Sequence, residues 1–259
     1  MWDRKGQFVS NIVPKQVPRQ IQLLLDTSGS MGVPKSPNWS NVARIAIQFA
    51  LQRKGEDLIA LDTFAERDES QVPMTADSKV VAGKIETIGN SGMGRTMLGL
   101  ALREILARRE NRLRFGDAII LVSDGERSDA DKTDFSQLRD DLIRHGVRIC
   151  LIRVQPVMGF GATQEATDVS KLVAETGGLV LNASGPLPQP QVRLDAEAIV
   201  SIVKDAYAFV RTYYRITLET SEILRAPRQL RLELSTQNGE KIKGLRLNYP
   251  RYFLPSSQN

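Results

Sequence analysis

The chain has 259 residues, of which 41% are hydrophobic and 25% charged, and its formal net charge is +5. These proportions are ordinary for a globular protein, and they exclude a disordered or fibrous chain. No run approaches the roughly 20 apolar residues that cross a bilayer, so no transmembrane segment is expected. The single cysteine, Cys150, excludes an intrachain disulfide and a zinc cluster of several cysteines.

Strands and helices alternate from Gln20 to about Tyr213. Short apolar runs that end at turn residues predict strands, and apolar residues at helical spacing predict amphipathic helices. The predicted strands are residues 21–25, 57–64, 71–75, 117–123, 147–154 and 179–182. The predicted helices are residues 41–53, 78–88, 97–108, 135–145, 167–176 and 196–212. This alternation implies an α/β fold with a mostly parallel central sheet and helices on both faces.

The C-terminal part has a different pattern. Residues 214–219 and 230–235 alternate polar and apolar side chains, and residues 241–247 form a less regular third strand. Asn238-Gly239 lies between the last two and is a strong hairpin-turn signal. We expect an antiparallel extension docked on the sheet edge, on the last helix or with residues 7–13. The expected organisation is an N-terminal segment 1–19, a core domain 20–212 and a β-hairpin extension 213–259.

Oxygen-bearing side chains follow two of the predicted strands. Asp26, Ser28 and Ser30 stand at alternate positions just after residues 21–25, and Asp124 follows residues 117–123. Thr96 ends a Gly-punctuated loop that leads into a helix. Ligands bind at the carboxyl ends of the strands in open α/β sheets, and one carboxylate with two hydroxyls suits Mg²⁺. The alternative is that Asp26 and Ser28 merely cap a turn or helix.

These segments together resemble the metal-ion-dependent adhesion site of von Willebrand factor A domains. The resemblance implies a Rossmann-like three-layer domain that binds Mg²⁺, with Mn²⁺ or Ca²⁺ as alternatives. It makes Ser28, Ser30 and Thr96 direct or near-direct ligands, with Asp26 and Asp124 acting directly or through water. A non-catalytic module of this kind captures an exposed Asp or Glu of a protein partner through the ion. The residues expected to contact the partner are Met31, Trp39, Gly94, Arg95, Gly125 and Glu126.

Trp39 has a second interpretation. It stands beside Ser40, a good helix N-cap, and a Trp in that place can anchor the start of the helix predicted over 41–53. The sequence leaves the partner contact and the helix anchor equally open.

The C-terminal extension points to a particular family among proteins with von Willebrand factor A domains. Tyr213-Tyr214 with its following strand, residues 230–235 and the closing Asn248-Tyr249-Pro250-Arg251-Tyr252-Phe253 are similar to the VWFA-related family described from acidobacterial genomes. That resemblance covers nearly the whole chain and suggests an exported or cell-surface bacterial protein. Residues 1–5 lack the apolar core of a signal peptide, which indicates a cytoplasmic protein or a trimmed chain.

The sequence also bears on four other functions: structural assembly, nucleic-acid binding, Ser-His-Asp catalysis and phosphoryl transfer. Arg and Lys residues of the extension offer a basic surface for structural assembly, but no zinc finger, recognition helix or aromatic platform supports specific nucleic-acid binding. The only histidine, His145, is far from Asp26 in sequence, so a Ser-His-Asp triad is not expected. A phosphotransferase similar to haloacid dehalogenases is the enzymatic alternative, with Asp26 as nucleophile. That family needs an Asp where this chain has Ser28.

Overall fold

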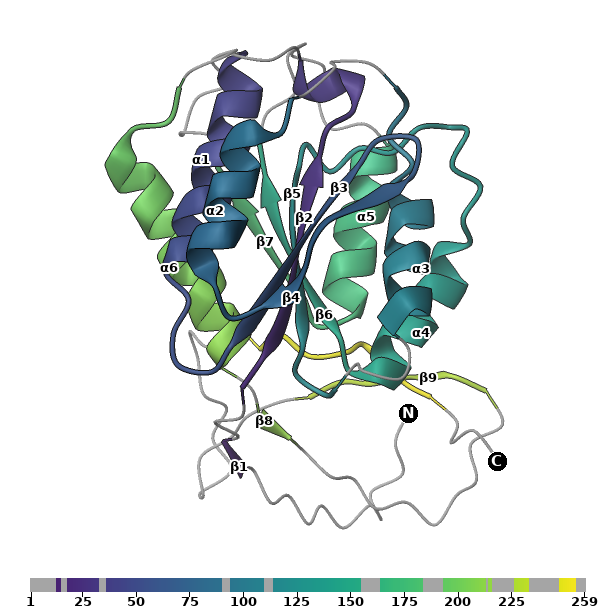
Figure 1. The fold of residues 1–259 in the computed structure, drawn as a ribbon. Helices are drawn as coiled ribbons and strands as arrows, with labels where there is room; N and C mark the ends of the chain where they lie inside the picture. The colour runs from purple at the N-terminus through teal and green to yellow at the C-terminus, as the bar shows by residue number, and fades with distance from the viewer. Residues whose placement is uncertain are drawn as a thin grey trace.

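A computed structural model describes residues 13–14, 18–32, 36–89, 94–109, 114–154, 164–183, 193–212, 214–215, 226–232 and 247–254. Six strands form one sheet in the order β4-β3-β2-β5-β6-β7 (Figure 1). β2, β3, β5, β6 and β7 run parallel, and the edge strand β4 is antiparallel to β3. The bounds are β2 Gln20–Asp26, β3 Leu58–Phe64, β4 Asp68–Thr75, β5 Ala118–Ser123, β6 Arg148–Arg153 and β7 Leu179–Asn182.

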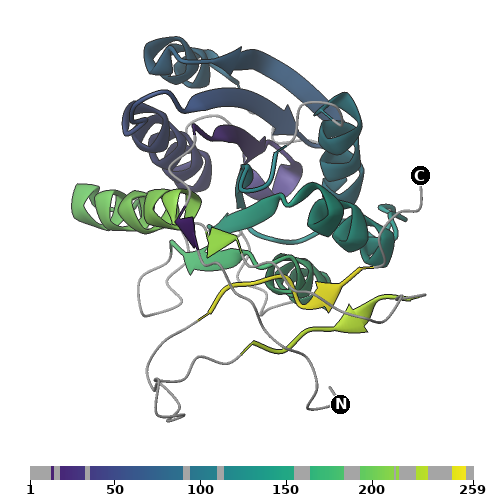
Figure 2. The same cartoon turned by 90° about the horizontal axis from the view of Figure 1, so that it is seen from below.

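Helices cover both faces of this sheet. Figure 2 shows α1, α2 and α6 on one side and α3, α4 and α5 on the other. Their bounds are α1 Pro37–Leu51, α2 Ser78–Thr87, α3 Leu98–Arg109, α4 Phe135–His145, α5 Gln164–Glu175 and α6 Ala196–Arg211. In the described segments, no helix is long and apolar enough to cross a membrane.

The central strand β2 is buried on both faces, which explains the consecutive apolar residues Leu23–Leu25 at its centre. Ile21, Leu23 and Leu25 belong to the core under α1, α2 and α6, whereas Leu24 belongs to the core under α3, α4 and α5. A parallel strand that is buried on both faces needs apolar side chains at successive positions. The predicted α/β class, with a mostly parallel sheet between two helical layers, is confirmed.

Two predicted helix starts are wrong. α5 begins at Gln164, three residues before the predicted 167–176, and the start of α1 differs more. α1 begins at Pro37, four residues before the predicted 41–53, and its N-cap is Ser36, whose Oγ accepts a hydrogen bond from the Trp39 amide at 3.2 Å. Pro fits the first turn of a helix because its missing amide hydrogen has no partner there. Ser40 therefore lies inside the helix and does not cap it.

The edge strand β4 also differs from its prediction. It begins at Asp68, whereas the sequence predicted only residues 71–75. Its first residues are polar and have no apolar alternation, so the sequence carries no strand signal there. They pair with the end of β3, with Asp68 opposite Phe64.

Two short antiparallel pairs lie near the amino ends of the parallel strands, at the bottom of Figure 1. β1 (Val13–Pro14) pairs with β8 (Tyr214–Arg215), and β9 (Arg228–Gln229) pairs with β10 (Tyr252–Phe253). The predicted Asn238-Gly239 turn lies outside the described residues. The division of the chain after residues 19 and 212 stays a prediction.

The β10 segment docks on α4 and α5. The Arg251 amide donates a hydrogen bond to the Glu175 carbonyl at 2.7 Å, and the Arg139 guanidinium lies 4.0 Å from the centroid of the Tyr252 ring. Arg139 also forms an ion pair with Glu175 at 3.5 Å. A cation over an aromatic face is attracted by the ring quadrupole, so this contact ties the β10 segment to the helical layer.

Two buried carboxylates fix the start of β2. Asp57 Oδ1 accepts a hydrogen bond from the Arg19 amide at 2.9 Å, and Asp117 Oδ1 accepts one from the Gln20 amide at 3.0 Å. Asp57 Oδ2 also accepts from the Tyr207 hydroxyl at 2.7 Å, which joins α6 to the same point. Burial, with this hydrogen bond to Asp57, raises the pKa of Tyr207 to about 12.

We expect Asp57→Ala to lower the free energy of unfolding by about 3 kcal/mol, because it leaves the Arg19 amide and the Tyr207 hydroxyl without their buried acceptor. Asp77 is a suitable control, since it is an exposed N-cap of α2 and its loss costs about 1 kcal/mol. Chemical denaturation measures both variants. Equal losses would show that the buried carboxylate contributes no more than an ordinary helix cap.

Candidate metal site

The predicted ligands meet at the carboxyl end of the sheet, at the top of Figure 1. Asp26 is the last residue of β2, and Asp124 directly follows β5, its neighbour in the sheet. The Gly29 amide donates a hydrogen bond to the Gly94 carbonyl at 3.2 Å, which holds the turn before Thr96 against the loop after β2. A 3₁₀ turn, η1 (Gly29–Met31), completes that loop.

Three hydroxyl groups lie in a row at this edge. The Thr96 hydroxyl donates to Ser28 Oγ at 2.9 Å, and Ser28 Oγ lies 3.2 Å from Ser30 Oγ. Ser28 is fully buried, Thr96 is 8% exposed and Ser30 is half-buried, so most of the row is shielded from solvent and Ser30 is its more accessible end. The structure therefore brings together the three neutral oxygen donors that the sequence predicted.

The two carboxylates stand beside this row. Asp26 Oδ1 accepts from the Ser28 amide at 2.9 Å, and Asp26 Oδ2 accepts from the Ser123 hydroxyl at 2.6 Å. Asp124 Oδ1 accepts from the Glu126 amide at 2.9 Å and lies 3.4 Å from Ser123 Oγ. Asp124 Oδ2 is buried and has no hydrogen-bond partner among the described residues.

The electrostatics of the pair favour a bound cation. Burial, together with the charge of Asp124, raises the pKa of Asp26 to about 7. Burial likewise raises the pKa of Asp124. Two carboxylates removed from water at close range disfavour each other's ionised form, and a divalent cation between them reverses that effect.

The residues present fit a hard divalent ion. Asp124 Oδ2 is a buried acceptor without a donor, and three hydroxyls are already in contact with one another. Carboxylate and hydroxyl oxygens are the donors that Mg²⁺ and Mn²⁺ take. Across the described segments no group of three or more His, Cys, Asp and Glu side chains is arranged to hold a metal, so any site here depends on the hydroxyls.

The residues predicted to contact a partner do not all reach the surface. Gly94 and Arg95 are exposed, and Glu126 is half-buried. Met31 is fully buried, Trp39 is 6% exposed, and both belong to the core under α1. Their burial argues against direct contact with a partner.

Gly125 is also buried, and its role is to give the turn after Asp124 a backbone conformation that other residues rarely adopt. Its φ of +79° is rarely adopted by other residues, and a Cβ there would lie 3.2 Å from Nε of Arg153. The turn after Asp124 therefore depends on glycine.

Ser123 was not among the predicted site residues. Its Oγ donates to Asp26 and accepts from the Gly125 amide at 3.0 Å, so it fixes the carboxylate of one strand against the end of the next. The only sequence signal was a polar residue at the last position of an otherwise apolar strand.

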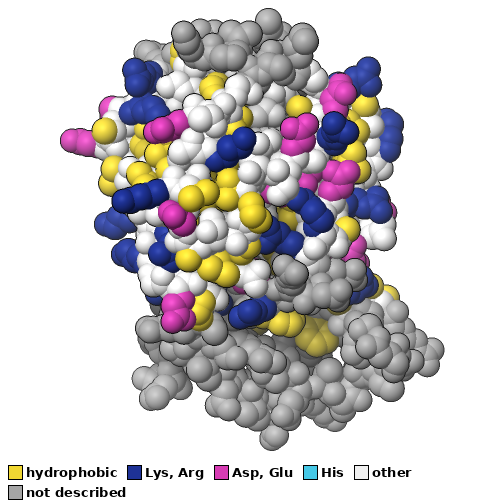
Figure 3. All heavy atoms as spheres, viewed as in Figure 1, with side chains coloured by type: hydrophobic (Ala, Val, Ile, Leu, Met, Phe, Trp, Pro, Cys, Tyr) yellow, Lys and Arg dark blue, Asp and Glu magenta, His cyan; other side chains and the backbone are white. Residues whose placement is uncertain are grey.

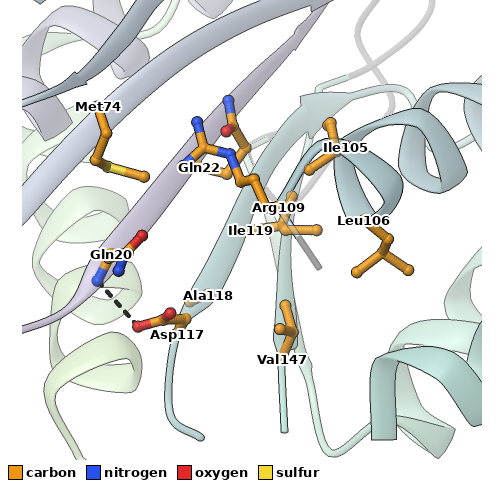
Figure 4. A pocket seen from close by; sticks show the side chains of 10 residues that line it. All are labelled: Gln20, Gln22, Met74, Ile105, Leu106, Arg109, Asp117, Ala118, Ile119 and Val147. Carbon is orange, nitrogen blue, oxygen red and sulfur yellow. Dashed lines mark hydrogen bonds between the residues drawn. The ribbon is translucent and has the colours of Figure 1, made fainter. Parts of the chain in front are cut away.

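A small cavity lies at the opposite end of the sheet (Figure 4). It is lined mostly by apolar side chains from the end of α3 and from β5, with polar groups from the start of β2. Its enclosed volume of about 10 Å³ has room for at most a single water molecule. This cavity is too small for an organic ligand.

Residues 21–126 match the family model of the von Willebrand factor type A domain, which spans β2 to the turn after β5 and includes all five predicted ligands. The fold and this segment together define a von Willebrand factor A-like α/β domain. The search of curated proteins finds no match to this chain.

Solved structures share the fold. An aerotolerance-related membrane protein from Bacteroides fragilis aligns with a TM-score of 0.53 and 16% identity, over 74% of this chain and 98% of its own. Proximal thread matrix protein 1 from the mussel byssus, with zinc in its metal-ion-dependent adhesion site, aligns with a TM-score of 0.58 and 16% identity, over 82% of this chain and 50% of its own. Manganese-loaded TRAP protein from Plasmodium vivax aligns with a TM-score of 0.51 and 16% identity, over 88% of this chain and 87% of its own. The structural alignments show a common fold, and at these identities they show no more than that. The closer resemblance to the acidobacterial-type family stays a prediction.

Proposed function

We propose that this protein is a non-catalytic, metal-dependent binding module that captures an acidic side chain of a protein partner. One observation carries the proposal: a buried carboxylate oxygen without a donor, Asp124 Oδ2, stands at an edge where three hydroxyls converge. The zinc and manganese in two proteins of the same fold support a metal at this place.

In this proposal Ser28, Ser30, Thr96 and Asp124 hold Mg²⁺ or Mn²⁺ directly. Asp26 acts through water, because both of its carboxylate oxygens already accept hydrogen bonds from Ser28 and Ser123. The hydroxyls add no charge, so the two carboxylates roughly neutralise the ion and leave it electrophilic. The bound ion supplies a Lewis-acid position for a carboxylate of the partner.

Among the described residues beside this position, backbone and charged side chains reach the surface. Gly94 and Arg95 are exposed beside Thr96, and Glu126 is half-buried beside Asp124. On the face that Figure 3 shows, basic and acidic side chains are interspersed. Among its described side chains, that face therefore carries no continuous basic patch of the kind that binds nucleic acid.

The phosphotransferase alternative receives little support from the geometry. Asp26 is fully buried, and its two oxygens are engaged by an amide and a hydroxyl, whereas a nucleophile needs an accessible oxygen. Assembly through a basic C-terminal surface remains the other candidate. In that region the Arg251 guanidinium already donates a hydrogen bond to the Tyr249 hydroxyl at 2.6 Å and lies 4.3 Å from the centroid of the Tyr249 ring.

Thr96→Ala tests the proposal with little change in the fold, because it removes a neutral ligand and leaves no buried charge unpaired. We expect a partner captured by the wild type in Mg²⁺ to be lost in EDTA and weakened at least about tenfold by Thr96→Ala. A pull-down from source cells in Mg²⁺ and in EDTA, followed by affinity measurement with the purified partner, gives both values.

Thr87→Ala is the matched control, because Thr87 is exposed at the end of α2 and its hydroxyl bonds only the Lys84 carbonyl at 2.8 Å. It should bind like the wild type. Binding that is indifferent to both EDTA and Thr96→Ala would contradict the proposal and favour the C-terminal surface. Phosphatase activity that Asp26→Asn abolishes would favour the enzymatic alternative.

A further inference from the structure

The turn that carries Thr96 leads directly into α3, and the first turn of that helix is capped from a distant loop. Met97 occupies the capping position, since its carbonyl accepts from the Ala101 amide at 3.0 Å, but its thioether is only a weak acceptor and not the side-chain oxygen of a usual N-cap. Instead, Asp131 Oδ2 accepts from the Gly99 amide at 2.6 Å. Asp131 is 3% exposed, and its negative charge is favourable at a helix N-terminus.

Asp131 belongs to the same loop that begins with Asp124. That loop also donates a hydrogen bond from the Ser128 amide to the Thr96 carbonyl at 2.8 Å. Two contacts, Ser128 to Thr96 and Asp131 to Gly99, therefore join the loop that begins with Asp124 to the turn and helix start that follow Thr96.

The loop itself is anchored to two helices. The Arg127 guanidinium donates to the Asp131 carbonyl at 2.9 Å, lies 4.3 Å from the centroid of the Phe135 ring in α4 and pairs with Asp168 of α5 at 3.6 Å. A movement of Asp131 is consequently opposed by α4 and α5, which makes it a fixed point for the start of α3.

Gly99 is shaped for this contact. A Cβ at that position would lie 2.6 Å from Thr133 Cβ, 2.8 Å from the Phe135 ring and 3.0 Å from Asp131 Oδ2. Alanine ordinarily stabilises a helix interior relative to glycine by about 1 kcal/mol, so the absence of a side chain here serves the approach of the loop and not the helix.

We infer that Asp131 is a positioning residue of the metal site, which sets the distance between Thr96 and Asp124 by holding the start of α3 against the 124–134 loop. The inference rests on the proposed function, and it assigns a role to a carboxylate that touches none of the proposed ligands. A positioning residue acts on metal affinity through ligand geometry, and such outer contacts typically change affinity about 10–100-fold.

Calorimetric titration with Mn²⁺ tests the role in metal binding. We expect Asp131→Ala and Gly99→Ala to bind Mn²⁺ at least about tenfold more weakly than the wild type, and Asp131→Asn, which keeps an oxygen acceptor, to stay within about threefold. Asp134→Ala is the control from the same loop. Asp134 caps α4 by accepting a hydrogen bond from the Ser136 amide at 2.8 Å, and no described bond joins it to α3. The Asp134→Ala variant should therefore bind Mn²⁺ with the affinity of the wild type.

Amide hydrogen exchange of the metal-free protein gives a second readout. Asp131→Ala should accelerate exchange of the Gly99 amide and of the Ser128 amide, whereas the interior of α3 keeps its protection. Unchanged affinity and exchange in Asp131→Ala, or equal losses in Asp134→Ala, would overturn the inference. A wild type that binds no Mn²⁺ contradicts the proposed function instead, and the exchange rates then decide whether Asp131 holds the Thr96 turn.

Discussion

Asp124→Asn is expected to weaken divalent-cation binding by at least about 100-fold and to stabilise the metal-free protein. Contacts outside the ligand set already change metal affinity about 10–100-fold, so the loss of a charged ligand should reach or exceed the upper value. The opposite sign for stability follows from the raised pKa of Asp124, because burial disfavours its charge in the folded protein.

The amide substitution preserves the architecture of the turn. An Asn oxygen still accepts from the Glu126 amide, which Asp124 Oδ1 accepts at 2.9 Å, and its NH₂ group takes the place of the oxygen that lacks a donor. The combination of a higher melting temperature with lost metal binding separates a removed ligand from a damaged fold, since damage would lower both.

Asp129→Asn is the matched control, because it removes the same charge from an exposed position in the same loop. It should change neither the melting temperature nor the affinity for Mn²⁺ beyond about twofold. A metal-dependent rise in melting temperature that survives Asp124→Asn would place the ion elsewhere.

The second large effect is on the pH dependence of stability. The pKa of Asp26 is raised from 3.8 in a model peptide to about 7 in the folded, metal-free protein, mainly by burial and then by the charge of Asp124. The folded state therefore binds more protons than the unfolded state between these values. By linkage, the contribution of Asp26 is fully present below about pH 4 and is lost as pH rises through about 7.

Metal-free protein should accordingly lose stability from about pH 5 to pH 8, and saturating Mg²⁺ should restore it at the upper end, where both carboxylates are ionised. Urea denaturation in EDTA across that range measures the slope. Asp26→Asn should make the slope shallower, because the group no longer titrates. Stability of the wild type that rises over the same range would contradict the buried, uncompensated pair.

The sequence predicted the parts of the fold that local periodicity controls. The run at Ile21–Leu25 predicted β2 because both of its faces are buried, and the 3.6-residue spacing of apolar side chains predicted the six helices. The convergence of Asp26 and Asp124 was also predictable, since the carboxyl ends of parallel strands meet at one edge. Thr96 follows no strand, and only the resemblance to von Willebrand factor A domains placed it at this edge.

Contacts between distant segments were not predictable in this way. Ser123 reads as an ordinary strand end, and its bond to Asp26 depends on the pairing of β5 with β2. Asp131 has no local pattern that links it to Gly99, 32 residues earlier. Trp39 was ambiguous because burial of a helix-start aromatic depends on the layer that packs against it, and the structure places it in the core.

In the proposed site, one divalent cation binds among Asp26, Ser28, Ser30, Thr96 and Asp124. The most direct measurement is an anomalous difference map from crystals grown with Mn²⁺. We expect a single strong peak next to the Ser28, Ser30 and Thr96 hydroxyls, and no such peak in crystals of Asp124→Asn. A map without density there at saturating Mn²⁺, or with the ion instead at Asp62 and Asp68 beside Arg108, would contradict a metal at these residues.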